Sequence, residues 1–341
     1  MYYIAFTLCL LFSIVCAIDI EHVDYNMEGI FTRKAIGING KWPIPFVEAT
    51  MGDTLIIHAT NKLSEPTSLH SHGLFQNGTN HYAGAAMVTE CGIPPNGTFT
   101  YRIPLQQAEP YWIHSHSKSQ TVDGLRTSLI IKDPNEAYHY DDEFVLIKRL
   151  NSPDPHIRFK PFVPYGIIGG ECANRKRIKF VPRKTYRLRL LNIGASFEFH
   201  FGMDGHELRI IEVDGVMVKE KPTHGITLGI GQRASVLVTA LNSTAYNYKF
   251  HADMFTDLLQ MPRYNPLNFT GTVEYSAEAR MKRQRGAIWM SAHDLDLEPL
   301  DGELALEPNR FISLDAYSGS GVFNDQTFRH SFNNVTYVAP Q

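Results

Sequence analysis

Apolar and polar residues alternate in short runs along most of the chain, and this pattern predicts β-strands. Turn signals such as Gly52-Asp53, Asn77-Gly78 and Asp133-Pro134 separate the first runs. The predicted strands of this part are Thr54 to Thr60, Thr98 to Pro104, Tyr111 to His116, Ser128 to Ile131 and Phe144 to Lys148. Many short, closely spaced strands are typical of a β-sandwich, so we expect an all-β fold.

A second block of strands follows the polar, proline-rich passage from Asn151 to Pro164. Its predicted strands are Lys184 to Leu191, Glu198 to Phe201, Leu208 to Val213, Ala234 to Ala240, Tyr246 to Ala252 and Gly271 to Tyr275. We therefore expect one sandwich domain over residues 19–135 and a second over residues 140–277. Residues 278–341 are irregular, with one strand candidate at Arg310 to Ala316. A length of 341 residues, 43% of them hydrophobic, is enough for two or three packed cores.

The start of the chain is an apolar run that ends in small residues and is followed by acids at Asp19 and Glu21. This pattern predicts a signal peptide over residues 1–17, cleaved after Ala17. A signal anchor is the alternative, but the run is shorter than the about 20 apolar residues that a membrane span needs. No later stretch is long and apolar enough to cross a bilayer, so we expect a secreted, extracellular protein or one in the lumen of the secretory pathway.

Sequons and cysteines agree with that compartment. The Asn-x-Ser/Thr sequons predict a glycoprotein modified at Asn77, Asn96, Asn242, Asn268 and Asn334. Removal of the signal peptide leaves Cys91 and Cys172, and an even pair in an oxidising compartment predicts a disulfide bond. A net charge of −3 with interspersed signs gives no indication of nucleic-acid binding.

Two His-x-His pairs are the chemical signal in the sequence, His70-Ser71-His72-Gly73 and His114-Ser115-His116. In a strand, residues i and i+2 point to the same face about 6.6 Å apart, so each pair projects two imidazoles in one direction. Two such strands side by side would direct four imidazoles at one volume. Neutral imidazole binds copper, zinc, iron or nickel, so the pairs predict a metal site.

The residues around these pairs resemble the multicopper oxidase family, in its laccase and fungal iron-transport ferroxidase branches. The segment from Thr67 to Thr79 is similar to the family's first copper motif, and Tyr111 to Gln120 is similar to its second. Between them, Thr89 to Gly97 resembles a Thr-Gln-Cys-Pro-Ile segment, and Leu129 to Pro134 also follows the family pattern. The four segments occur in the order and spacing of the family.

The resemblance implies tandem cupredoxin-like, Greek-key β-sandwich domains. It makes residues 278–341 a linker and the start of a third cupredoxin domain that is incomplete in this chain. It also implies copper, with His70 as a type 2 ligand and His72, His114 and His116 as type 3 ligands. Members of the family oxidise a small reductant, such as ferrous iron or a phenol, and reduce dioxygen to water.

Part of that chemistry needs residues that this sequence lacks. The type 1 site and the other cluster ligands of the family come from His-Cys-His and His-Pro-x-His-x-His segments of the third domain, and neither segment is present. Four of eight cluster histidines are present, so we expect the isolated, truncated chain to be inactive unless a missing domain or partner chain completes the cluster. The alternatives are a non-catalytic secreted copper-binding or degenerate homologue, and a structural or recognition sandwich with relic histidines.

Four further sites carry expectations. Where the family has an acid that assists proton delivery, this chain has Tyr82-Ala83-Gly84. Asp123 either orients a ligand imidazole or caps a turn. Phe75 and Trp112 are expected to be core aromatics.

Overall fold

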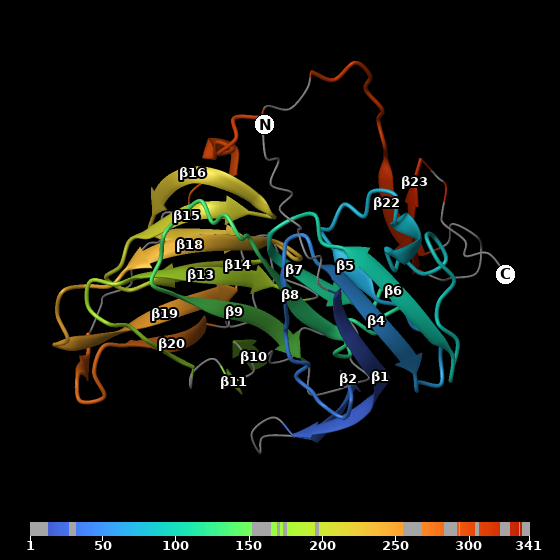
Figure 1. Cartoon of the computed structure of the whole chain (residues 1–341), viewed down its shortest axis with the longest axis horizontal. Helices are drawn as coiled ribbons and strands as arrows, with labels where there is room; N and C mark the ends of the chain where they lie inside the picture. The colour runs from blue at the N-terminus through green and yellow to red at the C-terminus, as the bar shows by residue number, and fades with distance from the viewer. Residues whose placement is uncertain are drawn as a thin grey trace, which may run out of the picture. The chain divides into compact units, whose positions relative to one another are not determined.

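The computed structural model describes residues 13–26, 32–151, 165–168, 171–172, 176–194, 198–254, 268–282, 292, 294–303, 307–320, 328–333 and 335. The chain forms two units, one through Asp301 and one from Gly302, and each is described by itself. Nearly all elements of the first unit are β-strands arranged in packed sheets (Figure 1). The predicted all-β sandwich class is confirmed. Within the described residues, no helix is long and apolar enough for a membrane span.

Two four-stranded sheets form the first sandwich. One has the order β2 (Thr32–Ile38), β1 (Ser13–Asn26), β4 (Thr54–Asn61) and β6 (Thr98–Pro104). The other has the order β3 (Val47–Thr50), β8 (Arg126–Lys132), β7 (Glu109–His114) and β5 (His70–His72). Alternate residues of β4, namely Leu55, Ile57 and Ala59, are buried in a core shared with Ile103 and Leu129. A single-turn 3-10 helix, η1 (Asn80–Tyr82), follows β5.

The second sandwich has larger sheets. The first runs in the order β11 (Glu171–Cys172), β10 (Tyr165–Ile168), β9 (Asp142–Asn151), β13 (Thr185–Asn192), β18 (Arg233–Thr239), β15 (Leu208–Val213) and β16 (Val216–Thr223). The second runs in the order β12 (Arg177–Lys179), β20 (Asn268–Glu274), β19 (Tyr246–Met254), β14 (Phe199–Met203) and β17 (Gly225–Leu228). Strand β21 (Arg280–Met281) pairs with β19, and a 3-10 turn, η4 (Asp294–Asp296), follows β21 in the chain. Leu188, Val236 and Phe250 lie in their common core. The domain boundaries at residues 19–135 and 140–277 stay predictions.

Most of the predicted strands are present in the structure, and two predictions differ from it. The strand predicted from Tyr111 to His116 ends at His114, so His116 lies beyond it. The strand predicted from Arg310 to Ala316 is wrong, because the strand begins only at Ala316. The residues before Ala316 are exposed and pair with no described strand, although Asn333, directly after β23, bonds to the backbone of Asp315.

Strand β1 begins within the predicted signal peptide. Ser13 to Ala17 run parallel to β4, with Ser13 opposite Thr54 and Ala17 opposite His58. The signal peptide and its cleavage after Ala17 stay predictions.

The second unit contains one described antiparallel hairpin. Strand β22 (Ala316–Ser320) pairs with β23 (Phe328–Phe332), and Ala316 lies opposite Phe332. Large apolar side chains of this unit, including Phe311 and Ile312, are exposed.

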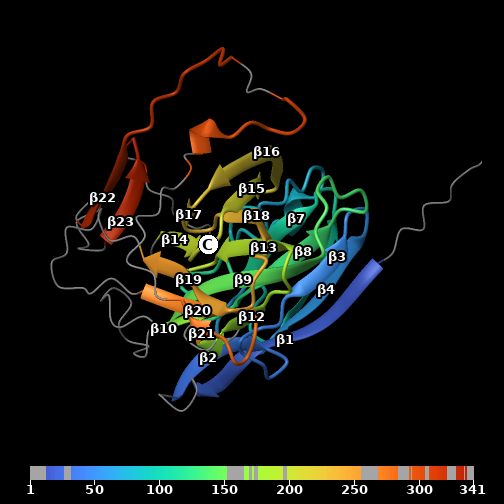
Figure 2. The ribbon, with the colours of Figure 1, turned by 90° about the vertical axis from the view of Figure 1, so that its left-hand side faces the viewer.

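The two sandwiches of the first unit meet along β7, which contacts β13 and β18 (Figures 1 and 2). An apolar cluster crosses this seam and consists of Trp112, Ile130, Ile147, Leu191 and Ile193.

A buried ion-pair network lies beside that cluster. Glu109, the first residue of β7, accepts hydrogen bonds from Arg187 and Arg189 of β13, and all three side chains are nearly inaccessible to solvent. Arg187 also pairs with Glu136, and Arg189 with Glu143 at 2.9 Å. Burial raises the pKa of Glu109, and the two guanidinium groups oppose that rise. Removing one partner of such a network leaves a buried charge uncompensated, so the network fixes the start of β7 firmly.

The expected disulfide between Cys91 and Cys172 is not formed, and that prediction is corrected. Cys91 is exposed with a free thiol, next to the isolated bridge between Thr67 and Ile93 in the first sandwich. Cys172 lies on β11, an edge strand of the second sandwich. Pairing needs Cα atoms within about 7 Å, and a count of cysteines contains no information on that distance.

We expect the substitution Cys91→Ser to change the free energy of unfolding by less than about 0.5 kcal/mol, because it alters one exposed side chain. Loss of a native disulfide would cost about 2–5 kcal/mol. Urea unfolding of the wild type and the variant, each without reductant, distinguishes the two cases. A loss of about 2–5 kcal/mol would contradict the free thiol and indicate that Cys91 forms a disulfide bond.

Candidate metal centre

The pairing of β5 with β7 brings the two His-x-His motifs together. These strands are antiparallel, with His70 opposite His114 and His72 opposite Trp112. Because alternate residues of a strand share a face, His70 and His72 project toward the same side as His114. His116 follows β7 and is exposed, yet its ring centroid is 5.3 Å from that of His70. All four predicted ligands therefore lie in one cluster.

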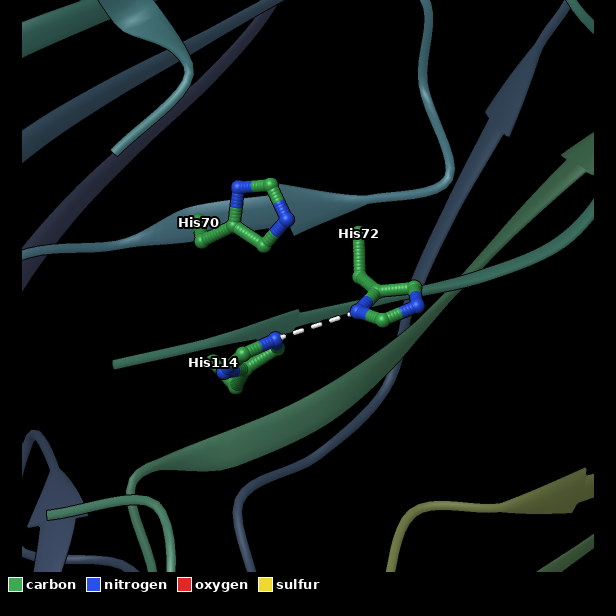
Figure 3. Close-up of side chains that lie close together, drawn as sticks. All are labelled: His70, His72 and His114. Atoms are coloured by element: carbon green, nitrogen blue, oxygen red, sulfur yellow. Dashed lines mark hydrogen bonds between the residues drawn. The ribbon is translucent and has the colours of Figure 1, made fainter. Parts of the chain in front are cut away.

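Three of the four imidazoles are close enough to share a metal ion. One ligand atom from each of His70, His72 and His114 lies within 4.8 Å of the other two. Nδ1 of His72 faces Nε2 of His114 at 3.4 Å (Figure 3). This trio is the only group of at least three His, Cys, Asp or Glu residues with such spacing among the described residues.

Backbone carbonyls orient two of the rings. Nδ1 of His70 lies against the carbonyl oxygen of Ala83, and Nδ1 of His114 lies 2.8 Å from the carbonyl oxygen of Ser115. A carbonyl can only accept, so each Nδ1 carries the proton and each Nε2 keeps its lone pair for a metal. The Thr121 hydroxyl donates to the same Ser115 carbonyl. His70 and His114 thus have the tautomer and the outer hydrogen bonds that imidazole ligands require.

Burial favours the neutral form of His70, His72 and His114. Desolvation lowers the pKa of His70. Desolvation, helped by the nearby Arg233 guanidinium and the other imidazoles, lowers the pKa of His72 to about 4. Desolvation lowers the pKa of His114 to about 3, although the Ser115 carbonyl opposes it. The metal-binding form of these rings is therefore the form present at neutral pH.

The indole ring of Trp112 packs against two of the imidazoles. The ring of Trp112 stacks on His114 with centroids 3.9 Å apart and an angle of 23°. The same indole lies 4.8 Å from the ring of His72. Trp112 is buried at the seam, as expected of a core aromatic.

Two expectations about nearby side chains are settled differently. Phe75, expected in the core, is 82% exposed, because the chain turns after β5 and its backbone N–H bonds to Gln107. Asp123 pairs with Arg33 at 2.9 Å and does not orient an imidazole among the described contacts. The carbonyls of Ala83 and Ser115 do so instead. Sequence reasoning missed them because a main-chain acceptor leaves no residue-type signal.

Two family models described as multicopper oxidase match the sequence, one over residues 19–136 and the other over residues 130–277. The chain belongs to the multicopper oxidase family. The residues matched include both His-x-His motifs and both sandwiches of the first unit.

Curated relatives in this family include both of its expected branches. The chain is 36% identical to the iron transport multicopper oxidase fetC of Epichloe festucae, over 95% of this chain and 54% of that protein. It is 33% identical to Laccase-4 of Thanatephorus cucumeris, over 94% of this chain and 67% of that protein. The chain thus spans about half the length of fetC and two thirds of Laccase-4.

Solved structures of multicopper oxidases confirm the cupredoxin-like fold. Fet3p, a multicopper oxidase that functions in iron import, superposes with a TM-score of 0.88 at 28% identity, covering 96% of this chain and 65% of Fet3p. The laccase from Botrytis aclada superposes with a TM-score of 0.80 at 28% identity, covering 94% and 63% of the two chains.

A partly buried carboxyl group, that of Glu90, supports the strand that begins with His70. The hydroxyl of Tyr101 accepts the backbone N–H of Leu69 at 3.0 Å and donates to Oε1 of Glu90 at 2.8 Å. Oε2 of Glu90 is buried and has no hydrogen bond with the described residues. Desolvation raises the pKa of Glu90 to about 7, against the lowering effect of the Tyr101 hydroxyl. Glu90 therefore stays protonated in the folded chain at mildly acidic pH.

This raised pKa predicts a pH-dependent stability in the metal-free protein. The contribution of Glu90 is complete below its unfolded pKa, near 4.5, and is lost as pH rises through about 7, since only the folded chain retains the proton in that window. Between pH 4.5 and 8 we expect wild type to lose about 1–2 kcal/mol relative to Glu90→Gln, less than full burial would give because the carboxyl is partly exposed.

Urea unfolding of both proteins across this range measures the difference. The comparison removes the effect of the histidines, whose lowered pKa values act in the opposite direction below pH 6.5. A difference that does not vary with pH would contradict the assignment.

Proposed function

We propose that His70, His72, His114 and His116 hold copper and that this chain contributes the half-site to a multicopper oxidase. Such an enzyme oxidises a small reductant and reduces dioxygen to water. The observation that carries the proposal is the convergence of three imidazole ligand atoms within 4.8 Å, on strands whose register places His70 opposite His114.

The donor set fits copper. Neutral imidazole is a good copper ligand, and clustered histidines can bind copper without thiolate ligands. Bound copper supplies one-electron redox chemistry. The chain's own residues orient the ligands. The Ala83 carbonyl holds the ring of His70, the Ser115 carbonyl holds the ring of His114, and Trp112 stacks on the face of His114. By resemblance, His70 serves a type 2 ion and the other three histidines serve type 3 ions.

A complete oxidase needs copper ligands other than these four histidines. The printed sequence has no His-Cys-His segment for a type 1 site. We propose that a further domain or a partner chain supplies the other cluster ligands and the electron entry site. The relatives include iron transport oxidases and laccases, so the proposed reductant is ferrous iron or a phenol.

The proposed compartment is the secretory pathway or the extracellular space. The signal-peptide pattern supports it, and so do the sequon residues Asn77, Asn96 and Asn242, which are exposed as glycosylation requires. Asn268 and Asn334 lie among residues whose side chains the structure does not describe.

We expect the full chain to bind Cu(II) at the four histidines, and the double substitution His70→Ala, His114→Ala to weaken that binding by at least about 100-fold. Titration of the metal-free chain with a copper salt against a competing chelator measures the affinity. His58→Ala is the matched control, because His58 is exposed on β4 and contacts Thr100 outside the cluster.

Equal affinity of the double variant and the wild type would exclude a copper site here. Copper binding that depends on the histidines, without oxidation of ferrous iron or a phenol when the remaining domains are supplied, would favour the non-catalytic copper-binding alternative.

A further inference from the structure

No described residue of the second sandwich belongs to the histidine cluster, yet the backbone of that sandwich lies against His72. Gly231 lies in the turn between β17 and β18, with φ of +80°. A Cβ atom at this position would lie 3.2 Å from Cε1 and 3.3 Å from Nε2 of His72. These distances are tighter than most real Cβ contacts, so a side chain at this position would push the His72 ring from its present place by a few tenths of an ångström. The turn therefore forms a wall against the Nε2 edge of His72.

Hydrogen bonds hold that turn in position. The N–H of Gly231 donates to the carbonyl of Asn192 at 2.9 Å. The N–H of Gly229 donates to the side chain of Gln232 at 2.6 Å, and the N–H of Gln232 returns to the Gly229 carbonyl at 3.1 Å. The wall is thus a fixed part of the second sandwich.

The guanidinium group of Arg233 joins this turn to β7 and to the residue that follows β5. Arg233, 4% exposed, donates from Nη1 to the Gly231 carbonyl at 3.1 Å and from Nε to the Pro110 carbonyl of β7 at 3.0 Å. Its Nη2 lies against Gly73, the residue after His72, where a Cβ would come within 2.6 Å. Asp214 anchors the group at 2.8 Å. A planar guanidinium can make these contacts together, and a lysine ammonium cannot.

We propose that Gly231 and Arg233 are positioning residues through which the second sandwich sets the orientation of His72. The inference rests on the proposed copper site, because it gives that site a second domain as its support. Gly231 limits movement of the ring away from the cluster, and Arg233 holds Gly73, which follows His72, and Pro110 on the adjacent strand β7. Nδ1 of His72 is thereby kept toward His114.

The deciding comparison is Gly231→Ala against Gly40→Ala in the full chain. Both glycines have positive φ, +80° and +69°, so both variants carry a similar backbone strain. A Cβ at Gly40 meets nothing within 4 Å, whereas one at Gly231 meets His72. We expect Gly231→Ala to weaken Cu(II) binding about 10–100-fold and Gly40→Ala to leave it within about twofold. Equal affinities of the two variants would overturn the proposal.

Arg233→Lys tests the same inference if Gly231→Ala does not fold. It keeps the positive charge and loses the forked contacts, so we expect a loss of copper affinity of about 10-fold or more. The matched control is Arg209→Lys, which alters an ion pair with Glu220 on the same sheet. Unchanged affinity in Arg233→Lys would likewise overturn the proposal.

A measurement without metal separates this inference from the copper proposal. In the metal-free chain, the imidazole nitrogen signals of His72 should shift in Gly231→Ala while those of His58 stay in place. That result supports positioning even if the wild type binds no copper. Unshifted His72 signals would count against positioning even if copper binds.

Discussion

The backbone pairing between β5 and β7 is the constraint on which the metal centre depends. Strand β5 has only three residues, and its register sets His70 opposite His114. The side-chain period of a strand is two, so a slip of one residue would replace both β5 imidazoles by other side chains on that face. Strand β7 must therefore be held more firmly than so short a partner could hold it.

The second sandwich supplies that hold at the start of β7. Glu109 has a φ of +106°, which is uncommon for a residue with a side chain, and two buried guanidinium groups keep it there. A buried ion pair of this kind adds little net stability compared with an apolar contact, but breaking it costs about 3–5 kcal/mol. Its value is in specifying one arrangement. Arg233 continues the same seam to Pro110, so consecutive residues of β7 are fixed from the second sandwich.

Local patterns in the sequence predicted many of the strands, although not β1, β2, β16 or β17, and they predicted that the two His-x-His motifs lie together, because alternation and motif spacing are properties of neighbouring residues. What they could not predict depends on distant contacts. Gly231 packs on His72, although the two residues lie far apart in the chain, and neither residue type predicts this contact. The free thiol of Cys91 has the same cause, since a pairing rule contains no distances. Arg310 to Asp315 have a strand pattern but no neighbouring strand in the described residues.

The stacking of Trp112 on His114 has an optical consequence. An indole in face-to-face contact with a ligand ring is within a few ångströms of whatever that ring binds, and its excited state is sensitive to such a neighbour. Trp42, by contrast, packs against Tyr25 and bonds to the Gly124 carbonyl, away from the imidazoles. If copper fills the proposed site, the emission of Trp112 would report its binding without an added label.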